Sequence, residues 1–247
     1  GGTMVHGIPV YNFVAEATAE HQIDAAFGFV PGRFTKDAAL EVLEAGISFL
    51  VITTEGVPSR DMIQIIHYAA QKGARVLGPD TAGVISPGKC KLGVHPNRMF
   101  VEGHVGVLSK SGALSYEVCK NLTESGIGQS TVVGIGGGPF WGVTQPAVLK
   151  LFQEDPETKA VVLLGEVGGT MEIEAAEYIK SNMTKPVVAL IVGRSAPEGA
   201  QMGHAGAIIE GNEGTAASKI KALEKAGVRV AYRPSEIPQI IKSFGVL

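Results

Sequence analysis

A histidine in a glycine-rich stretch is the residue with the clearest chemical potential in this sequence. His204 lies in Gly203-His204-Ala205-Gly206-Ala207, where nothing bulky crowds its imidazole. An imidazole with a pKa near its unperturbed value of roughly 6.5 is a competent nucleophile toward phosphorus at cellular pH. We therefore interpret His204 as a candidate phosphoryl acceptor. The other histidines lack this context and are predicted to be structural or to lie at the surface: His6, His21, His67, His95 and His104.

A nucleophilic histidine needs an acidic partner that orients its ring and stabilises the charged phospho-imidazole. Glu166 is the candidate, because it directly follows an apolar run in Gly165-Glu166-Val167-Gly168-Gly169. As the end of a predicted strand, it should lie at the same sheet edge as the loop of His204. The alternative is that Glu166 caps a helix, as isolated carboxylates at strand ends often do.

The turn Ser109-Lys110-Ser111-Gly112 is a candidate phosphate site. It stands between a predicted strand and a segment of helical periodicity. The free amides and the dipole of a helix start favour a phosphate, so we predict that Ser111 and Gly112 hold one. The plainer alternative is that Ser111 is an ordinary helix N-cap.

Two familiar nucleotide motifs are missing from the sequence. There is no G-x-x-x-x-G-K-S/T loop, and the run from Gly134 to Pro139 fails as G-x-G-x-x-G because Pro139 holds its sixth position. We therefore predict no nucleotide-hydrolysing site within this chain. The same gap disfavours a nicotinamide dehydrogenase that would use His204 as acid and base.

The elements that must position these residues alternate between strands and helices in two blocks, which predicts an α/β fold with parallel sheets. Strands are predicted in the first block at 9–13, 25–30, 49–54 and 75–77, and in the second at 105–109, 130–135, 160–165, 187–192 and 228–232. Each strand of the second block precedes a helical segment, the pattern of a five-unit doubly wound fold. Residues 78–88, rich in Gly and Pro, are predicted to connect the blocks.

Two helices show the expected periodicity. In the first block, Met62, Ile65, Ile66 and Ala69 form one apolar stripe, and Gly73 is predicted to end that helix. In the second block, Ile173, Ala176, Ile179 and Met183 are predicted to face the core, whereas Glu172, Glu174 and Lys180 are predicted to point away from it.

Glycines gather just after the predicted strands of the second block, at Gly112, 136–138, 168–169 and 193–206. Ligands of an open parallel sheet bind outside the carboxyl ends of its strands, where loops bring backbone amides close to them. A single such loop is more simply explained as a tight turn. Four of them on one edge predict a binding site.

Composition excludes several classes of protein. The chain has 247 residues, of which 33 are Gly and 18% are charged, with a net charge of −3. These values exclude a disordered chain, a coiled coil and a nucleic-acid scaffold. No apolar run is long enough to span a membrane and no basic segment opens the chain, so we expect a soluble cytoplasmic protein. Two cysteines fit a reducing compartment, and a mean hydropathy of +0.20 favours an oligomer.

Several motifs in this order together resemble the alpha subunits of the succinyl-CoA synthetase family of NDP-forming succinate–CoA ligases, or of close relatives that activate malate or citrate. The resemblance covers essentially the whole chain. Its most specific motif is Met202-Gly203-His204-Ala205-Gly206-Ala207-Ile208-Ile209, and the others are Ile52-Thr53-Thr54-Glu55-Gly56, Gly78-Pro79, Ser109-Lys110-Ser111-Gly112, Gly134-Ile135-Gly136-Gly137 and Gly165-Glu166-Val167-Gly168-Gly169.

The resemblance implies a Rossmann-like CoA-binding domain at 1–82, with its N-terminal part missing, and a flavodoxin-like ligase domain at 83–247. It also implies a partner beta subunit with an ATP-grasp site for ATP or GTP and Mg²⁺, and a small dicarboxylate substrate. The location implied is cytoplasmic, or the mitochondrial matrix in a eukaryote.

By the same resemblance, NTP phosphorylates His204 with the support of Glu166, the phosphoryl group passes to a carboxylate, and the thiol of CoA then displaces phosphate. The resemblance assigns phosphate binding to Ser111 and Gly112, substrate binding to Tyr116, Gly136 and Gly137, and CoA binding to Thr53, Thr54 and Glu55.

The sequence departs from the family pattern in three places. The chain begins where the family would still carry an upstream β-α-β portion with a glycine-rich CoA phosphate loop. Asp80-Thr81 replaces an Asn-Cys pair near the CoA thiol, and Gly138 replaces an Asp ahead of Phe140 and Trp141. These changes keep open a citrate- or malate-CoA ligase and a catalytically silent CoA-binding regulatory module.

Overall fold

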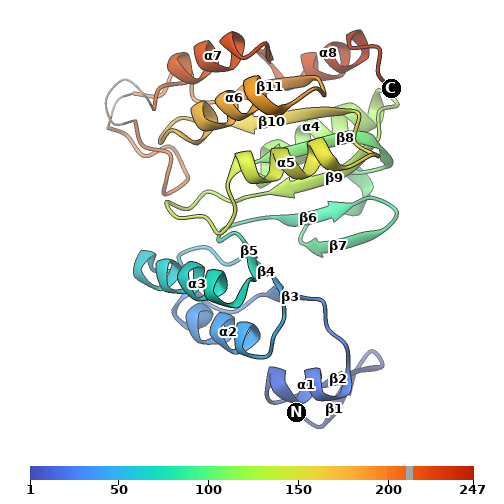
Figure 1. Cartoon of the computed structure of the whole chain (residues 1–247), viewed down its shortest axis with the longest axis vertical. Helices are drawn as coiled ribbons and strands as arrows, with labels where there is room; N and C mark the ends of the chain where they lie inside the picture. Colours follow the sequence, from blue (N-terminus) through green and yellow to red (C-terminus); the bar gives the residue numbers. More distant parts are fainter. Residues whose placement is uncertain (198, 210–213) are drawn as a thin grey trace.

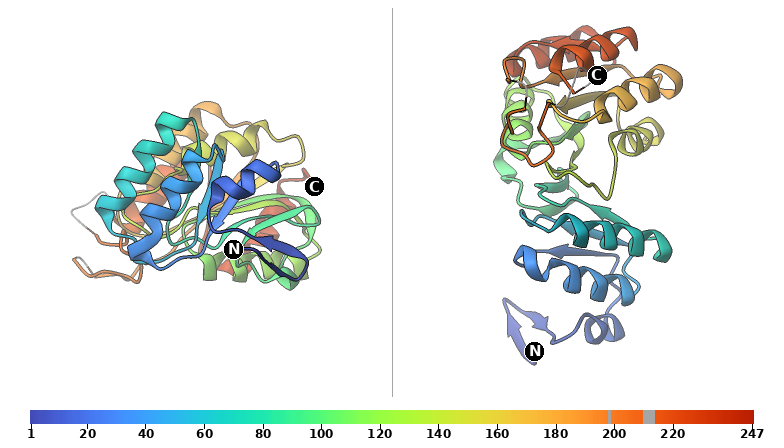
Figure 2. Two further views of the ribbon diagram at one scale, coloured as in Figure 1. Left: turned by 90° about the horizontal axis from the view of Figure 1, so that it is seen from below. Right: turned by 90° about the vertical axis from the view of Figure 1, so that its left-hand side faces the viewer.

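The computed structural model describes residues 1–197, 199–209 and 214–247, which form two α/β units and a short N-terminal hairpin. Figure 1 shows the smaller unit and the larger unit stacked along the long axis of the molecule, with the N-terminus at the far end of the smaller unit. The side view in Figure 2 shows the same stacking. In the part of the chain that the structure covers, no helix has the length and apolar character needed to cross a membrane.

The larger sheet confirms the predicted doubly wound α/β fold. Its strand order is β12-β11-β10-β8-β9-β6-β7, and the five strands from β12 to β9 are parallel. Counted along the chain, these five have the order 2-1-3-4-5, which is typical of flavodoxin-like sheets. Their bounds lie close to the predictions: β8 Glu102–Ser109, β9 Gln129–Gly134, β10 Ala160–Gly165, β11 Val187–Ile191 and β12 Arg229–Ala231.

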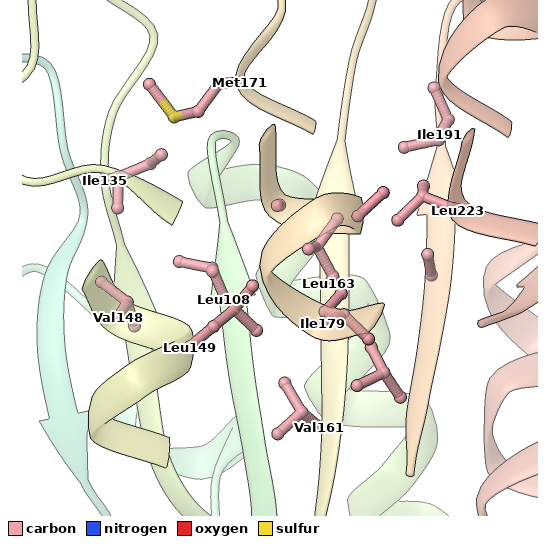
Figure 3. Packing of buried hydrophobic residues seen from close by; sticks show 14 of the residues in the cluster. Leu108, Ile135, Val148, Leu149, Val161, Leu163, Met171, Ile179, Ile191 and Leu223 are labelled. Atoms are coloured by element: carbon pink, nitrogen blue, oxygen red, sulfur yellow. The ribbon is translucent and has the colours of Figure 1, made fainter. Parts of the chain in front are cut away.

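The parallel strands are buried on both faces, which explains why they appear in the sequence as continuous apolar runs. In β10, Val161 and Leu163 face one side and Val162 and Leu164 the other. Figure 3 shows the first side, packed against α5 Gln145–Glu154, α6 Met171–Asn182 and α7 Ala216–Lys225. The second side packs against α4 Gly112–Glu124 and α8 Ile237–Ser243.

The predicted connection at 78–88 is wrong in part, because it contains a strand of the larger sheet. β6 Gly83–Ser86 pairs antiparallel with β9 and with β7 Cys90–Gly93. One of the glycines that suggested a linker, Gly83, instead permits close strand pairing, since a Cβ at Gly83 would lie 2.1 Å from the carbonyl oxygen of Leu92. The two hairpin strands extend the sheet beyond its five predicted members.

The smaller unit has a parallel sheet of order β3-β4-β5, formed by Ala25–Gly28, Phe49–Ile52 and Arg75–Leu77. Helices α2 Gly32–Glu44 and α3 Ser59–Lys72 lie side by side on it (Figure 1). The apolar stripe of α3 is confirmed, since Met62, Ile65 and Ala69 are buried, and Gly73 ends this helix in the left-handed conformation.

The predicted strand at 9–13 is not part of that sheet. Residues Ile8–Val10 form β2, which pairs antiparallel with β1 Thr3–Val5, and helix α1 Val14–Glu20 follows. Both strands of this hairpin are largely exposed. A short β-rich run predicted a strand here, but a run of this kind does not identify the strand with which it pairs.

The predicted orientation of α6 is wrong at Glu172. Ala176 and Ile179 are buried as expected, and Glu174 and Lys180 are exposed. Glu172, however, is fully buried, because Lys110 and Lys219 from two other segments neutralise its carboxylate. A rule that places charged residues outside fails where the partners come from distant parts of the chain.

Candidate active site

The structure brings His204 and Glu166 into direct contact. Glu166 follows the last residue of β10, and His204 lies on the long segment between β11 and α7. The distance from His204 Nδ1 to Glu166 Oε2 is 2.7 Å. The side chain of Glu166 is 8% exposed and that of His204 is 26% exposed, so the histidine remains partly accessible. The catalytic roles of both residues remain predictions.

Glu166 also favours the protonated form of the ring. The hydrogen bond that His204 donates to Glu166 raises the pKa of His204 above its ordinary value, against the opposing effect of partial burial. The charge of Asp80 raises this pKa as well, whereas the charge of Lys110 lowers it. Since the carboxylate accepts from Nδ1–H, the lone pair of the neutral ring lies on Nε2.

Three of the predicted glycine loops pack around this histidine. A Cβ at Gly137 would lie 2.3 Å from the ring of His204, so only glycine allows the observed packing. The amide of Gly206 donates to the carbonyl of Gly137 at 3.2 Å. A Cβ at Gly168 would lie 2.2 Å from the carbonyl oxygen of Gly206. Gly137 therefore lies beside His204 and Gly136 lies beside Pro79 and Asp80, while the contact of both glycines with a substrate remains a prediction.

The turn before α4 lies at the same edge of the sheet. Ser111 is the N-cap of α4, and its hydroxyl accepts from the amide of Leu114 at 3.3 Å. The capping interpretation of Ser111 is therefore correct as far as its hydroxyl is concerned. It does not exclude a phosphate, because the first amides of a helix have no acceptor within that helix. Phosphate binding by Ser111 and Gly112 stays a prediction.

The predicted CoA-binding loop follows β4. The hydroxyl of Thr53 donates to the carbonyl of Gly28 at 3.1 Å, and that of Thr54 donates to the carbonyl of Val30 at 2.7 Å. Both hydroxyls retain lone pairs that can accept from a ligand. Glu55 is exposed. The free lone pairs of the two hydroxyls are compatible with a polar ligand such as CoA. The hydrogen bonds that the hydroxyls donate hold the loop itself in place.

Asp80 contacts this loop through its backbone and acts electrostatically on the histidine. Its backbone has φ of +55°, and its amide donates to the carbonyl of Thr54 at 3.0 Å. Burial raises the pKa of the Asp80 carboxyl, the charges of Glu55 and Glu166 raise it further, and His204 lowers it. The neighbouring Thr81 has a structural part, since its hydroxyl donates to the carbonyl of Gly134 at 2.5 Å.

Tyr116 is half-buried on α4, beside the turn at Gly112. Its ring packs edge-on against Phe100 and His95, with ring centroids 6.3 Å and 5.9 Å away. His95 is 1% exposed, and neither of its ring nitrogens has a hydrogen-bond partner among the residues that the structure describes. Burial lowers the pKa of His95 to about 4, so its ring is neutral at cellular pH. The substrate role of Tyr116 stays a prediction.

Comparison with known proteins now adds the family. A CoA binding domain model matches residues 1–56, and a CoA-ligase model matches residues 108–229. The succinate–CoA ligase (ADP-forming) subunit alpha 1 of Archaeoglobus fulgidus is 56% identical over 231 residues, which cover 94% of this chain and 79% of that protein. The chain belongs to the family of succinate–CoA ligase alpha subunits. The family predicted from the motifs is thereby confirmed.

Other relatives agree with membership of the succinate–CoA ligase alpha subunits. The alpha subunit from Staphylococcus aureus is 50% identical over 237 residues, 96% of this chain and 78% of that protein. Among solved structures, a mutant ATP citrate lyase of Methanosaeta concilii with bound (3S)-citryl-CoA has a TM-score of 0.87 at 26% identity. The match covers 97% of this chain but 42% of the lyase, so the chain corresponds to less than half of that longer protein.

The sequence interpretation of this succinate–CoA ligase family member missed two buried residues below the site. Lys219 and Glu172 are both fully buried. One signal could have revealed Lys219, because it shares a helical face with the apolar Ala216 and Leu223. A lysine on such a stripe has to find a buried partner.

Proposed function

We propose that the chain is the alpha subunit of an NDP-forming succinate–CoA ligase in which His204 carries the phosphoryl group. The observation that supports it most is the 2.7 Å contact between His204 Nδ1 and Glu166 Oε2 at the carboxyl edge of the larger sheet. The names of relatives that are 50% and 56% identical support succinate as the acid.

In the proposed first step, His204 Nε2 attacks the terminal phosphorus of the nucleotide. The N–P bond forms while the bond to the leaving NDP oxygen breaks, and NDP leaves with that electron pair. Glu166 keeps the proton on Nδ1 and stabilises the positive charge that develops on the ring. The missing Cβ of Gly137 leaves room for the ring beside this loop.

In the next steps the carboxylate of the acid takes the phosphoryl group, and the electron pair of the N–P bond returns to Nε2. The thiol of CoA then attacks the acyl carbon, loses its proton and expels inorganic phosphate. In this proposal, Ser111 and Gly112 hold the phosphate at the start of α4. The substrate contacts are Tyr116, Gly136 and Gly137, and the CoA contacts are Thr53, Thr54 and Glu55.

The nucleotide has to come from another subunit in this scheme. We propose an ATP-grasp beta subunit that binds ATP or GTP with Mg²⁺, in keeping with the alpha-subunit names of the relatives. The acid is a small dicarboxylate. A cytoplasmic location, or the mitochondrial matrix in a eukaryote, fits two free cysteines and archaeal and bacterial relatives.

The experiment is a thiokinase assay of the assembled alpha–beta complex with succinate, malate and citrate. We expect succinyl-CoA to form, and we expect His204→Asn to abolish it. A strong preference for citrate would overturn the choice of acid and would direct attention to Gly138 and Trp141. Absence of any acyl-CoA in the intact complex would favour the silent CoA-binding module.

A further inference from the structure

A cluster of three buried charges lies directly beneath the His204–Glu166 pair. We call Lys110, Glu172 and Lys219 the lysine–glutamate cluster, and their exposed fractions are 3%, 0% and 0%. Lys110 Nζ lies 2.9 Å from Glu172 Oε1, and Lys219 Nζ contacts Glu172 Oε2. Removing three charges from water is expensive, and a hydrophobic replacement is often at least as stable. Stability alone therefore explains the cluster poorly.

The cluster holds the backbone of Glu166 from both sides. The amide of Glu166 donates to Glu172 Oε1 at 3.3 Å, and the carbonyl of Glu166 accepts from Lys219 Nζ at 2.7 Å. Lys219 also donates to the carbonyl of Gly168 at 2.6 Å, so all three of its ammonium hydrogens have acceptors. Glu172 and Lys219 therefore fix the main chain of Glu166, the residue that contacts His204.

The cluster also contacts the loop of Gly136 and Gly137, through Lys110 and Trp141. Lys110 belongs to the predicted phosphate turn, and its ammonium lies 5.1 Å from the ring centroid of Trp141. The indole of Trp141 donates to the carbonyl of Gly136 at 2.8 Å, next to the glycine that packs on His204. Glu172 therefore joins the loop of Glu166 to the turn before α4 and, through Lys110, to the loop at 136–137.

We propose that the lysine–glutamate cluster is a positioning unit that fixes the loop of Glu166, so that its carboxylate meets Nδ1 of His204. Lys110, Glu172 and Lys219 touch neither nucleotide nor acid in this role and act through Glu166. The proposal rests on the proposed function, because the orientation of His204 matters for catalysis only if His204 carries the phosphoryl group. Its structural part can be tested without turnover.

Because of the charges around His204, the direction in which its pKa changes in a variant distinguishes two explanations. Those that act on the ring are Glu166 from the end of β10, Asp80 from the segment before β6, and Lys110 from the turn before α4. Lys219 acts on Glu166 rather than on the ring. Loosening Glu166 lowers the pKa of His204, whereas simple loss of a nearby positive charge raises it.

The test is a titration of the full chain, labelled with ¹³C and ¹⁵N histidine, by NMR. The signal of His204 is assigned by its loss in His204→Asn. We expect Lys219→Met to lower the pKa of His204 by roughly one unit, as loss of one good hydrogen bond would. An unchanged or raised pKa in folded Lys219→Met would overturn the proposal.

Lys185→Met is the matched control. Lys185 Nζ also donates to two main-chain carbonyls, those of Phe152 and Asp155, but it lies just before β11, at the opposite edge of the sheet. It should leave the titration of His204 unchanged. Should Lys219→Met fail to fold, Lys219→Gln takes its place, because its amide can keep one carbonyl contact. The same outcomes then apply, with a smaller expected shift.

A kinetic measurement separates this proposal from the proposed function. In the assembled complex, we expect Lys219→Met to slow phosphorylation of His204 about tenfold at neutral pH, with the KM for the nucleotide unchanged. If the wild-type complex formed no phosphohistidine, the proposed function would fail. The titration would still decide whether the cluster positions Glu166.

Discussion

Two regions of the larger unit bury titratable groups away from water, and they do so in opposite ways. The lysine–glutamate cluster keeps its charges and pairs them all, since Lys110 and Lys219 outweigh burial and hold the pKa of Glu172 below its usual value. In the described part of the chain the ring nitrogens of His95 have no hydrogen-bond partner, and burial keeps the ring neutral. The comparison teaches that paired buried charges resist a change of pH, whereas an unpaired buried base makes a protein sensitive to acid.

Breaking the paired region should have the largest effect. Glu172→Leu leaves Lys110 and Lys219 buried without a counter-charge, which should lower the free energy of unfolding by about 3–5 kcal/mol. Urea unfolding at pH 7 measures this loss. A loss below about 1 kcal/mol would mean that water reaches the lysines in solution.

The unpaired region should show itself in acid. The unfolded chain binds a proton at His95 below about pH 6.5, whereas the folded chain binds it only below about pH 4. Stability should therefore fall by about 3 kcal/mol as pH drops through this window, because 2.5 pKa units correspond to that energy. Thermal unfolding of the wild type and of His95→Leu across this window tests it. Equal pH dependence of the two would contradict the assignment.

Glu166 lies between the paired cluster and the solvent-facing histidine, so its removal sharpens the comparison. Glu166→Gln keeps the shape but loses the charge that raises the pKa of His204. We expect phosphorylation to slow about a hundredfold. The acid limb of the pH–rate profile should move to lower pH, because without the charge of Glu166 the ring of His204 loses its proton at lower pH. A pH–rate profile measures both, and an unmoved limb would remove Glu166 from this role.

An exposed ion pair gives the smallest expected effect and the baseline for the others. Lys120 Nζ lies 3.5 Å from Glu124 Oε1 on α4, and both side chains are more than half exposed. Lys120→Ala should change the unfolding free energy by less than about 0.5 kcal/mol. A loss as large as that of Glu172→Leu would mean that burial does not distinguish these pairs.

Much of the fold could be predicted from local pattern. The five parallel strands appear as apolar runs such as 160–165, because burial on both faces demands them. β6 was missed, since its glycine, Gly83, serves strand pairing but in the sequence resembles a linker residue. The partner of β2 was missed because a short β-rich run does not identify the strand with which it pairs.

The site divides in the same way. His204 and Glu166 could be brought together from the sequence because both follow strands whose carboxyl ends share one edge. Glu172 could not, since its burial depends on Lys219, 47 residues away along the chain. Long-range pairing of charges leaves only a weak local trace.

The most direct test of the account is to map the phosphorylated residue in the assembled complex. After a brief incubation with radiolabelled nucleotide, peptide mass spectrometry should find an acid-labile phosphoryl group on His204. It should be absent in His204→Asn and transferable to succinate when CoA is added. A stable label at another residue, or full labelling of His204→Asn, would contradict the account.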